Sequence, residues 1–366
     1  LTTAQVVALT TTQVAGLTTT QVAALTTSQI RALETVDLAA LTSDQVPVLT
    51  TAQIAALTTA QIAAITTDQI SDLTPAQLEA LTTAQIPALS TANIALLEET
   101  QLQAIQTQDF VHLTASQIQA LTVTQVPWLT DAQVQALTTA QMQALATDDL
   151  QALSTEQFSL LSGTQLAAMG TAQIVALTTE QAGAISASQL AALTPAQVAA
   201  LEIEDLEELS TTAIQALTSQ QAAALTTTQV AALTSDQLPV LTTAAVAALT
   251  TAQIQALTVD QVPLLTTAQI VALTETQAGA LTSAQLGALS VSQWVAMQTA
   301  DVAALSTDAV VGLTTAQVAA MTGGQFAALS SAQIAQMDVV DVAAFTTAHV
   351  AALTTEQTPG LSASQI

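Results

Sequence analysis

The chain has 366 residues, of which 51% are hydrophobic and 8% charged, and its formal net charge is −26 with Arg31 as the one basic residue. Binding to DNA, RNA or an anionic membrane needs many lysines and arginines, so this balance argues against all three partners. The absence of cysteine excludes disulfides, and no apolar run is long enough to predict a transmembrane segment.

One eight-residue unit fills the whole chain. Cut from Leu1, the units read LTTAQVVA, LTTTQVAG and LTTTQVAA, and the register holds to the partial unit LSASQI, giving 45 full octads and six residues. A fixed short period is typical of repeat proteins, in which each unit contacts only its neighbours. We therefore expect residues 1–366 to form a single continuous octapeptide-repeat array, and the partial last octad predicts that it is a segment of a longer protein.

The first half of the octad predicts the start of a helix. With the positions numbered 1 to 8, position 1 is Leu in 38 of 46 units, position 2 is Thr or Ser in 38, and position 5 is Gln in 35. Thr or Ser followed three residues later by Gln is a capping box, in which each side chain bonds the backbone N–H of the other residue. Pro75 and Pro195 stand at position 3, the first helical residue, where proline is well tolerated.

The second half of the octad predicts that each helix is short. Position 6 is a large apolar residue in 42 units, so positions 1 and 6 are the expected core. Proline at position 7 disfavours helix at position 6, which limits the helix to between one turn and one and a half turns. The prolines at position 7 are Pro47, Pro87, Pro127, Pro239, Pro263 and Pro359. Glycines at positions 7 and 8 are expected to serve a bend between helices. These are Gly16, Gly183, Gly279, Gly287, Gly312 and Gly360.

These features predict an all-α fold, an elongated solenoid of very short capped helices with one helix per octad. A β-solenoid is the alternative, although it would favour alternating β-branched residues. One long helix is disfavoured because the Leu stripe would wind around it and proline recurs within it. Side chains larger than Ala at position 8 fall mostly in even-numbered octads, which predicts two octads, or 16 residues, per coil.

Positions 2 and 5 vary together. Six octads carry Asp at position 5, and all six lack the hydroxyl at position 2. These aspartates are Asp37, Asp109, Asp149, Asp205, Asp301 and Asp341. The coupling predicts that positions 2 and 5 contact each other and that the acid near the helix N-terminus is stabilised by the helix dipole. It favours a structural role for both positions.

The histidines and tryptophans are the first candidate site residues. His112 and His349 lie far apart in sequence, whereas a metal or catalytic site needs nearby partners, so we expect both to be structural. Trp294 occupies a core position, while Trp128 follows a proline at a bend, where it could contact a partner.

The acidic residues are the remaining candidates. Their tightest cluster is Glu202, Glu204, Asp205, Glu207 and Glu208, with Asp148 and Asp149 as a weaker one. A solvated, capped helix start is the favoured interpretation over a cation site. Phosphate-binding loops, dinucleotide fingerprints and nucleophile motifs are absent from the sequence. We therefore predict no catalytic residues, no cofactor-binding residues and no metal ligands, and expect that the protein is not an enzyme.

Units such as LTTAQIAA at residues 49–56 and LTTAQVAA at residues 313–320 resemble the octads of very large bacterial secreted or surface proteins. Those proteins are loosely labelled adhesion or haem-utilisation exoproteins, and the resemblance covers the entire chain. It implies an extracellular or cell-surface location and a structural, adhesive or filament-forming role. Haem use finds no support in His112 and His349. LTPAQVAA at residues 193–200 also resembles the opening helix of repeat DNA-binding effectors, which need longer repeats and basic residues.

The sequence therefore predicts an extracellular structural protein that forms a rod, a self-assembling filament or a surface stalk of a bacterium. Adhesion is a further expected role. The expected partner is the chain itself, through end-to-end or lateral association, with surface glycans as a further partner. The alternative is a binding module that uses a regular Thr face to bind ice or glycans.

Overall fold

The computed structural model describes all 366 residues, and its regular secondary structure is entirely helical. The α-helices are four to six residues long and the 3-10 helices have three residues, as in α12, α2, α14 and η2. The predicted all-α solenoid of short helices is thus confirmed, and the β-solenoid alternative is wrong because no strand forms. No helix in the chain has the length and apolar character needed to cross a bilayer.

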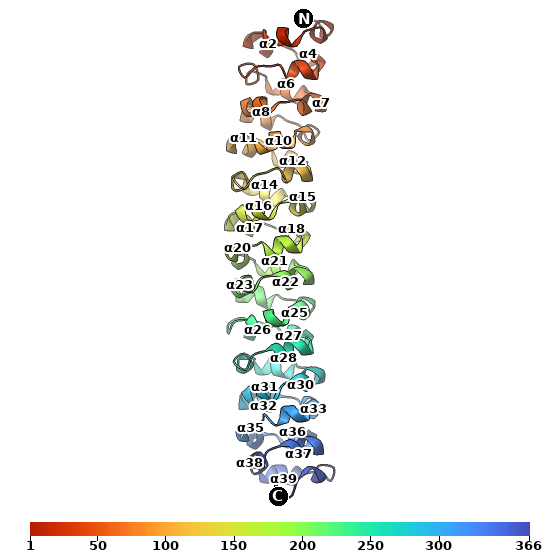
Figure 1. Cartoon of the computed structure of the whole chain (residues 1–366), viewed down its shortest axis with the longest axis vertical. Helices are drawn as coiled ribbons and strands as arrows, with labels where there is room; N and C mark the ends of the chain where they lie inside the picture. Colours follow the sequence, from red (N-terminus) through yellow and green to blue (C-terminus); the bar gives the residue numbers. More distant parts are fainter. The chain divides into compact units, whose positions relative to one another are not determined.

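The chain divides into two compact units, residues 1–181 and residues 182–366. Within each unit the helices follow one another in stacked layers (Figure 1). The elements of unit 1 are α1 (Thr3–Val7), α2 (Thr11–Ala15), α3 (Thr19–Ala23), α4 (Thr27–Ala32), α5 (Thr35–Leu38), α6 (Thr51–Ala56), α7 (Thr59–Ala63), α8 (Thr67–Asp72), α9 (Pro75–Glu79), η1 (Ile86–Ala88), α10 (Thr91–Ala95), α11 (Glu99–Ala104), α12 (Thr107–Phe110), α13 (Ala115–Ile118), η2 (Val126–Trp128), α14 (Asp131–Ala136), α15 (Thr139–Ala144), α16 (Thr147–Ala152), α17 (Thr155–Ser159), α18 (Gly163–Ala168) and α19 (Thr171–Val175).

Helix α20 (Thr179–Gly183) begins in unit 1 and ends in unit 2. The elements of unit 2 are α21 (Ala187–Ala192), α22 (Pro195–Ala200), α23 (Ile203–Glu208), α24 (Thr211–Gln215), α25 (Ser219–Ala224), α26 (Thr227–Ala232), η3 (Leu238–Val240), α27 (Thr243–Ala248), α28 (Thr251–Ala256), η4 (Val262–Leu264), α29 (Thr267–Val271), α30 (Glu275–Ala280), α31 (Ser283–Ala288), α32 (Val291–Ala296), α33 (Thr299–Ala304), α34 (Thr307–Val310), α35 (Thr315–Ala320), α36 (Gly323–Ala328), α37 (Ser331–Gln336), α38 (Val339–Val342), α39 (Thr347–Ala352) and η5 (Thr358–Gly360).

Each helix begins where the octad predicts. In α14, the Thr130 hydroxyl accepts a hydrogen bond from the Gln133 N–H at 3.2 Å, and the Gln133 side-chain oxygen accepts one from the Thr130 N–H at 3.0 Å. This is the predicted capping box, with position 2 as the N-cap. Pro75 and Pro195 are the first residues of α9 and α22, which confirms their placement.

The prolines at position 7 replace the α-helix with tighter turns. Pro87 and Pro127 lie in the 3-10 helices η1 and η2, each preceded by a turn over positions 3 to 5 of the octad. Proline lacks the N–H that an α-helix would need there, whereas a three-residue 3-10 helix tolerates its fixed φ. The predicted limit on helix length is therefore confirmed.

The coil is larger than predicted. Helix α15 packs against α18 in unit 1, and α22 packs against α25 in unit 2, so packed helices are three octads apart. Side-chain hydrogen bonds between coils reach back 28 and 31 residues, as from Gln133 to Ile105 and Leu102. One turn of the coil therefore takes between three and four octads, and the prediction of two octads per coil is wrong.

The connection between helices explains the larger coil. After α4, Leu33 and Glu34 at positions 1 and 2 are both extended, with ψ of 135° and 154°. An extended connection of this kind separates successive short helices, and between three and four of them complete one turn.

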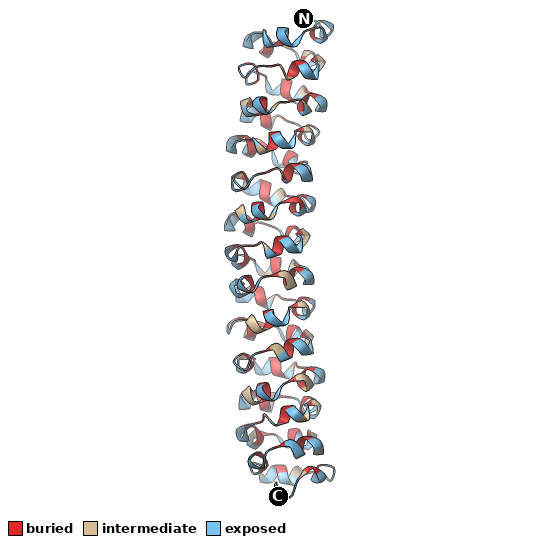
Figure 2. Cartoon of the chain, viewed as in Figure 1, coloured by how far each residue is buried: buried red, intermediate tan, exposed pale blue.

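Positions 1 and 6 form the core of each unit. Position 6 residues such as Ile30 and Ile118 are fully buried, and position 1 residues such as Leu113 and Leu121 are 3–4% exposed. Figure 2 shows buried residues along the inner side of the coils and exposed ones on their outer side. The predicted core is confirmed, and the burial of these two side chains supplies most of the hydrophobic stabilisation of each octad.

The glycines at positions 7 and 8 were expected to serve bends between helices. They do not take the left-handed conformation in which glycine usually ends a helix. No glycine in the chain has a positive φ. Several instead lie where neighbouring coils approach closely, because an added Cβ at Gly279 would lie 2.9 Å from the Ala304 carbonyl oxygen. At Gly312 a Cβ would overlap the carbonyl group of Ser283. Their role is to allow this contact between backbones.

Candidate functional site

The most regular polar feature of the molecule is the row of buried glutamines at position 5. Gln133 is 1% exposed, and its side chain bonds in two directions. The oxygen completes the capping box of its own octad, while Nε2 donates to the backbone oxygens of Leu102 and Ile105, both at 2.9 Å. A primary amide has two N–H donors and one acceptor oxygen, and here both donors and the oxygen have partners.

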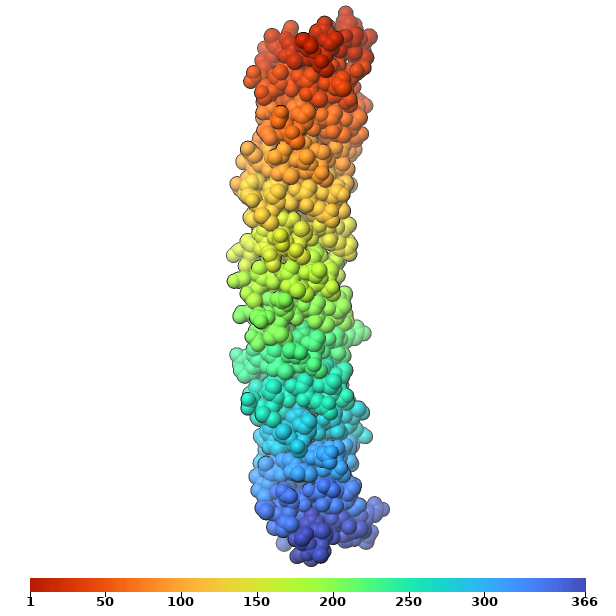
Figure 3. All heavy atoms as spheres, in the orientation of Figure 1, coloured from red at the N-terminus to blue at the C-terminus, as the bar shows by residue number.

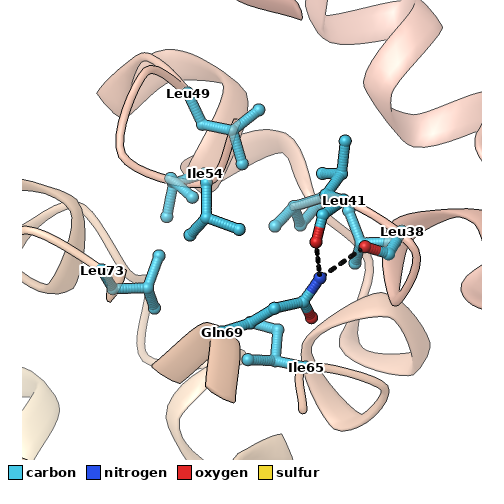
Figure 4. A pocket seen from close by; sticks show the side chains of 9 residues that line it. Leu38, Leu41, Leu49, Ile54, Ile65, Gln69 and Leu73 are labelled. Carbon is cyan, nitrogen blue, oxygen red and sulfur yellow. Dashed lines mark hydrogen bonds between the residues drawn. The ribbon is translucent and has the colours of Figure 1, made fainter. Parts of the chain in front are cut away.

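The same two bonds recur at the same offsets in both units, and we call this row of side chains the glutamine ladder. Gln69 donates to Leu38 and Leu41 at 2.8 and 3.0 Å, as drawn in Figure 4. In unit 2, Gln285 donates to Ile254 and Leu257 at 2.7 and 2.8 Å. Each side chain therefore ties one coil to the preceding coil.

The ladder solves a problem that short helices create. A position 1 residue such as Leu257 is the C-cap of its helix, α28, where no further helical turn offers its carbonyl a donor. A buried carbonyl without a donor costs about 1–3 kcal/mol. The glutamine supplies that donor without adding charge.

The sequence reasoning assigned this glutamine to capping alone and missed its bond to the neighbouring coil. One signal was available. Glu satisfies a capping box as well as Gln does, yet position 5 is never Glu in the 46 units. Glu has no N–H to donate to the preceding coil, which accounts for its absence where Gln serves the ladder.

Asn93 shows what a shorter amide can reach. Its Nδ2 donates to the Ile65 carbonyl at 2.9 Å, 28 residues back. Its Oδ1 is buried without a hydrogen-bond partner, so the bond to the N–H of Ser90 is not made. One methylene less therefore leaves one ladder bond intact and the capping box incomplete.

We expect Asn93→Gln to raise the free energy of unfolding by about 1–2 kcal/mol, because it restores a bond to Ser90 and one to Ile62. Urea unfolding followed by circular dichroism measures the change. The matched control is the reverse substitution at Gln125, which donates to Ile94 and Leu97 at 2.9 Å, and Gln125→Asn should lower stability. Equal stability of all three proteins would contradict this account of the ladder.

His349 is a substitute for the ladder glutamine. Its Nδ1 accepts from the Thr346 N–H at 3.2 Å, and its Nε2 bonds the Met321 carbonyl oxygen at 2.8 Å. This pair of bonds requires the neutral ring with the proton on Nε2. The ring also stacks on Phe326 with centroids 5.1 Å apart. The expected structural role of His349 is confirmed, while His112 lies exposed at position 8.

The six aspartates at position 5 occupy the same buried slot. Each is at most 8% exposed, and in each of these octads the N-cap side chain makes no capping bond. The backbone N–H of Gln298 bonds the carboxylate of Asp301, as it would bond a ladder glutamine. Positions 2 and 5 are therefore in contact in this octad, as predicted.

Burial outweighs the helix dipole at these carboxyls, contrary to expectation. Burial, with the charges of Glu202 and Glu204 added, raises the pKa of Asp205 to about 6. Burial also raises the pKa of the carboxyls in four further octads. These are Asp109, Asp149, Asp301 and Asp341. The charged form is therefore disfavoured at these five carboxyls, although a charge at a helix N-terminus is usually favourable.

The acidic cluster does not converge on one point. Glu202 and Glu204 line an open surface groove of about 370 Å³ with Thr226 and Thr228, whereas Asp205 is buried. The chain contains no group of three or more His, Cys, Asp or Glu side chains arranged to hold a metal ion.

The apolar cavity drawn in Figure 4 is small. It lies among Leu38, Leu41, Ile54 and Leu73, and its volume of about 10 Å³ is roughly that of one water molecule. On the face drawn in Figure 3, side-chain atoms cover the coils of each unit closely. The cavity is a packing gap within the core of unit 1.

The tryptophans and threonines complete the predicted candidates. Trp294 is fully buried, which confirms its core role, and Trp128 is half-buried at a bend, where a partner contact stays a prediction. The threonines at positions 2 and 3 lie mostly at the surface.

The repeat itself connects the chain to known proteins. The ALTTAQ repeat matches ten segments of the chain, residues 1–27, 22–51, 47–75, 62–99, 102–139, 142–179, 163–195, 198–235, 232–267 and 295–331. The chain belongs to the ALTTAQ repeat family. The sequence ALTTAQ occurs at residues 56–61 of this ALTTAQ repeat protein. It contains Ala56 at the end of α6, the core residue Leu57, the N-cap Thr58 and the ladder residue Gln61. No curated protein matches the chain.

Proposed function

We propose that this ALTTAQ repeat protein is a structural segment of a bacterial surface protein, a stalk that spans distance outside the cell. The observation that carries the proposal is the glutamine ladder. In both units it joins coil to coil through the same pair of bonds, as at Gln133 and Gln285. An array held by nearest-neighbour contacts can be lengthened by adding repeats without changing its interior.

The positions of the octad that recur from unit to unit support a structural role. The features that recur in most octads are the cap, the core and the ladder, and each is used for folding. The exposed positions 3, 4 and 7 vary between Thr, Ala, Ser, Gln and acidic residues from one octad to the next. The net charge of −26 opposes non-specific association and favours solubility.

Electron microscopy of the purified protein tests the proposal that it forms a stalk. We expect single particles of uniform width that are many times longer than they are wide, and a globular protein of similar mass serves as the control. Compact particles would overturn the proposal. Images at rising protein concentration distinguish single stalks from filaments, the form that self-association would produce.

The extracellular location rests on the resemblance of the octads to those of bacterial surface proteins and needs its own test. Cells that carry the protein are treated with a protease that does not enter them, and the repeat array is detected by antibody. Loss of the array from intact cells, with a cytoplasmic control protein preserved, is the expected result. Survival of the array until the cells are lysed would contradict a surface location.

A further inference from the structure

Two buried aspartates occupy ladder positions where the preceding coil offers a carbonyl oxygen and no basic side chain. Asp149 in unit 1 and Asp301 in unit 2 are 4% and 2% exposed. By the register of the ladder, the carbonyls in reach are those of Leu121 and Leu273, each 28 residues back, as Ile65 is from Asn93. At ladder positions such as Gln133 the corresponding carbonyl receives an N–H, and an ionised carboxylate has no proton to give.

Asn93 shows that a side chain of this length reaches the preceding coil. Aspartic acid and asparagine have the same shape, and Asn93 places Nδ2 2.9 Å from the Ile65 oxygen. At Asp301, Oδ2 is buried without a hydrogen-bond partner, and the carboxyl receives the Gln298 N–H. A proton on Oδ2 would turn this unpartnered atom into a donor.

The charges around the two sites favour the neutral acid. Asp301 lies on α33, which packs against α30 and α36, and Glu275 on α30 is the one charged residue among these three helices besides Asp301 itself. Asp149 lies on α16, which packs against η2 and α19; neither of these carries a charged residue, and Asp148 is its one charged neighbour on α16. No basic side chain is present to stabilise either carboxylate.

We propose that Asp149 and Asp301 are proton-binding rungs of the ladder, which as neutral acids donate an O–H to the preceding coil and so make the array more stable in mild acid than at neutral pH. The raised pKa of both carboxyls agrees with this geometry. A group whose pKa is higher in the folded than in the unfolded state binds more protons when folded. Its stabilisation is complete below the unfolded pKa and is lost as the pH rises through the folded value.

The test compares the pH dependence of unfolding in three full-length proteins. Asp149→Asn/Asp301→Asn replaces both rungs by amides that donate at any pH. The control, Asp68→Asn/Asp236→Asn, removes the same two charges at exposed position 4 sites, one in each unit. It therefore accounts for the general loss of self-repulsion in acid.

We expect the unfolding temperature of the rung variant to exceed that of the wild type at about pH 7.5 and to converge with it by about pH 4, near the ordinary pKa of aspartate. The control should keep the pH dependence of the wild type. A rung variant that keeps this dependence too would overturn the proposal.

A second measurement on the wild type does not depend on a folded variant. At about pH 5 exposed aspartates are ionised, so an infrared carboxylic acid band in the folded protein that disappears on unfolding reports buried neutral acids. Absence of that band in the folded wild type would overturn the proposal as well.

Discussion

Gln285→Glu is expected to lower the free energy of unfolding by about 3 kcal/mol, because it puts a buried charge where the ladder needs a donor. Gln285 is 2% exposed, and its Nε2 lies 2.7 Å from the Ile254 oxygen and 2.8 Å from the Leu257 oxygen. Glutamate keeps the length of the side chain and its acceptor for the Thr282 N–H, so the capping box survives. The substitution therefore isolates the bonds between coils from the bond within the octad.

The matched control is Gln215→Glu, which makes the same chemical change at an exposed position 7. We expect it to alter stability by no more than about 0.5 kcal/mol. Urea unfolding at neutral pH gives both values, and the Gln285→Glu deficit should shrink in acid as the carboxyl becomes a donor. Equal unfolding midpoints for the two variants would show that the ladder contributes little.

The sequence predicts contacts within one octad well. The capping box between Thr130 and Gln133 spans three residues, so the geometry of a helix start is enough to specify it. The core positions follow equally, because an octad this small can bury its Leu and Ile only against neighbouring octads. The proline at position 7 also acts locally, and it leads to the observed 3-10 helices.

Contacts between coils could not be predicted in the same way. The bond from Gln133 to Leu102 spans 31 residues and depends on how many octads close one turn. The pattern at position 8 was a poor guide to that number, because this position lies at a bend near the surface. Leu96 is 45% exposed there, and Trp128 is half-buried, so no partner in the next coil limits the size of either side chain.

For the aspartates at position 5, the sequence pattern was read correctly, but the predicted effect on the charged carboxylate was wrong. The charge was expected to be stabilised, whereas burial disfavours it at five of them. The exchange between positions 2 and 5 was visible in the sequence, and it reflects a real contact such as that of Asp301 with Gln298. Whether the acid is stabilised depends on burial, which the octad alone does not reveal. Once the coil buries position 5, the cost of desolvation exceeds the benefit of the helix N-terminus.

The closest approach between coils gives the second large expected effect. Gly312→Ala should lower the free energy of unfolding by about 3 kcal/mol, because the new Cβ would overlap the Ser283 carbonyl group. That group is backbone and cannot rotate away, so α31 and the bend after α34 would have to separate. Most octads carry Ala at position 8, so the effect is confined to the few places where coils approach this closely, as they also do at Gly360 and Ser331.

Gly323→Ala provides the control, because a Cβ at Gly323 would meet no atom within 4 Å. Gly323 is the first residue of α36, where alanine is expected to leave stability unchanged or raise it by about 0.5–1 kcal/mol. Thermal unfolding of both variants measures the contrast. If Gly312→Ala unfolds at the same temperature as Gly323→Ala, the coils can move apart at little cost, and the spacing between them is not set by backbone contact. If Gly312→Ala unfolds at a much lower temperature than Gly323→Ala, the packing of one coil on the next requires glycine at position 312. Close packing between coils is then the role of this glycine, in place of a bend between helices.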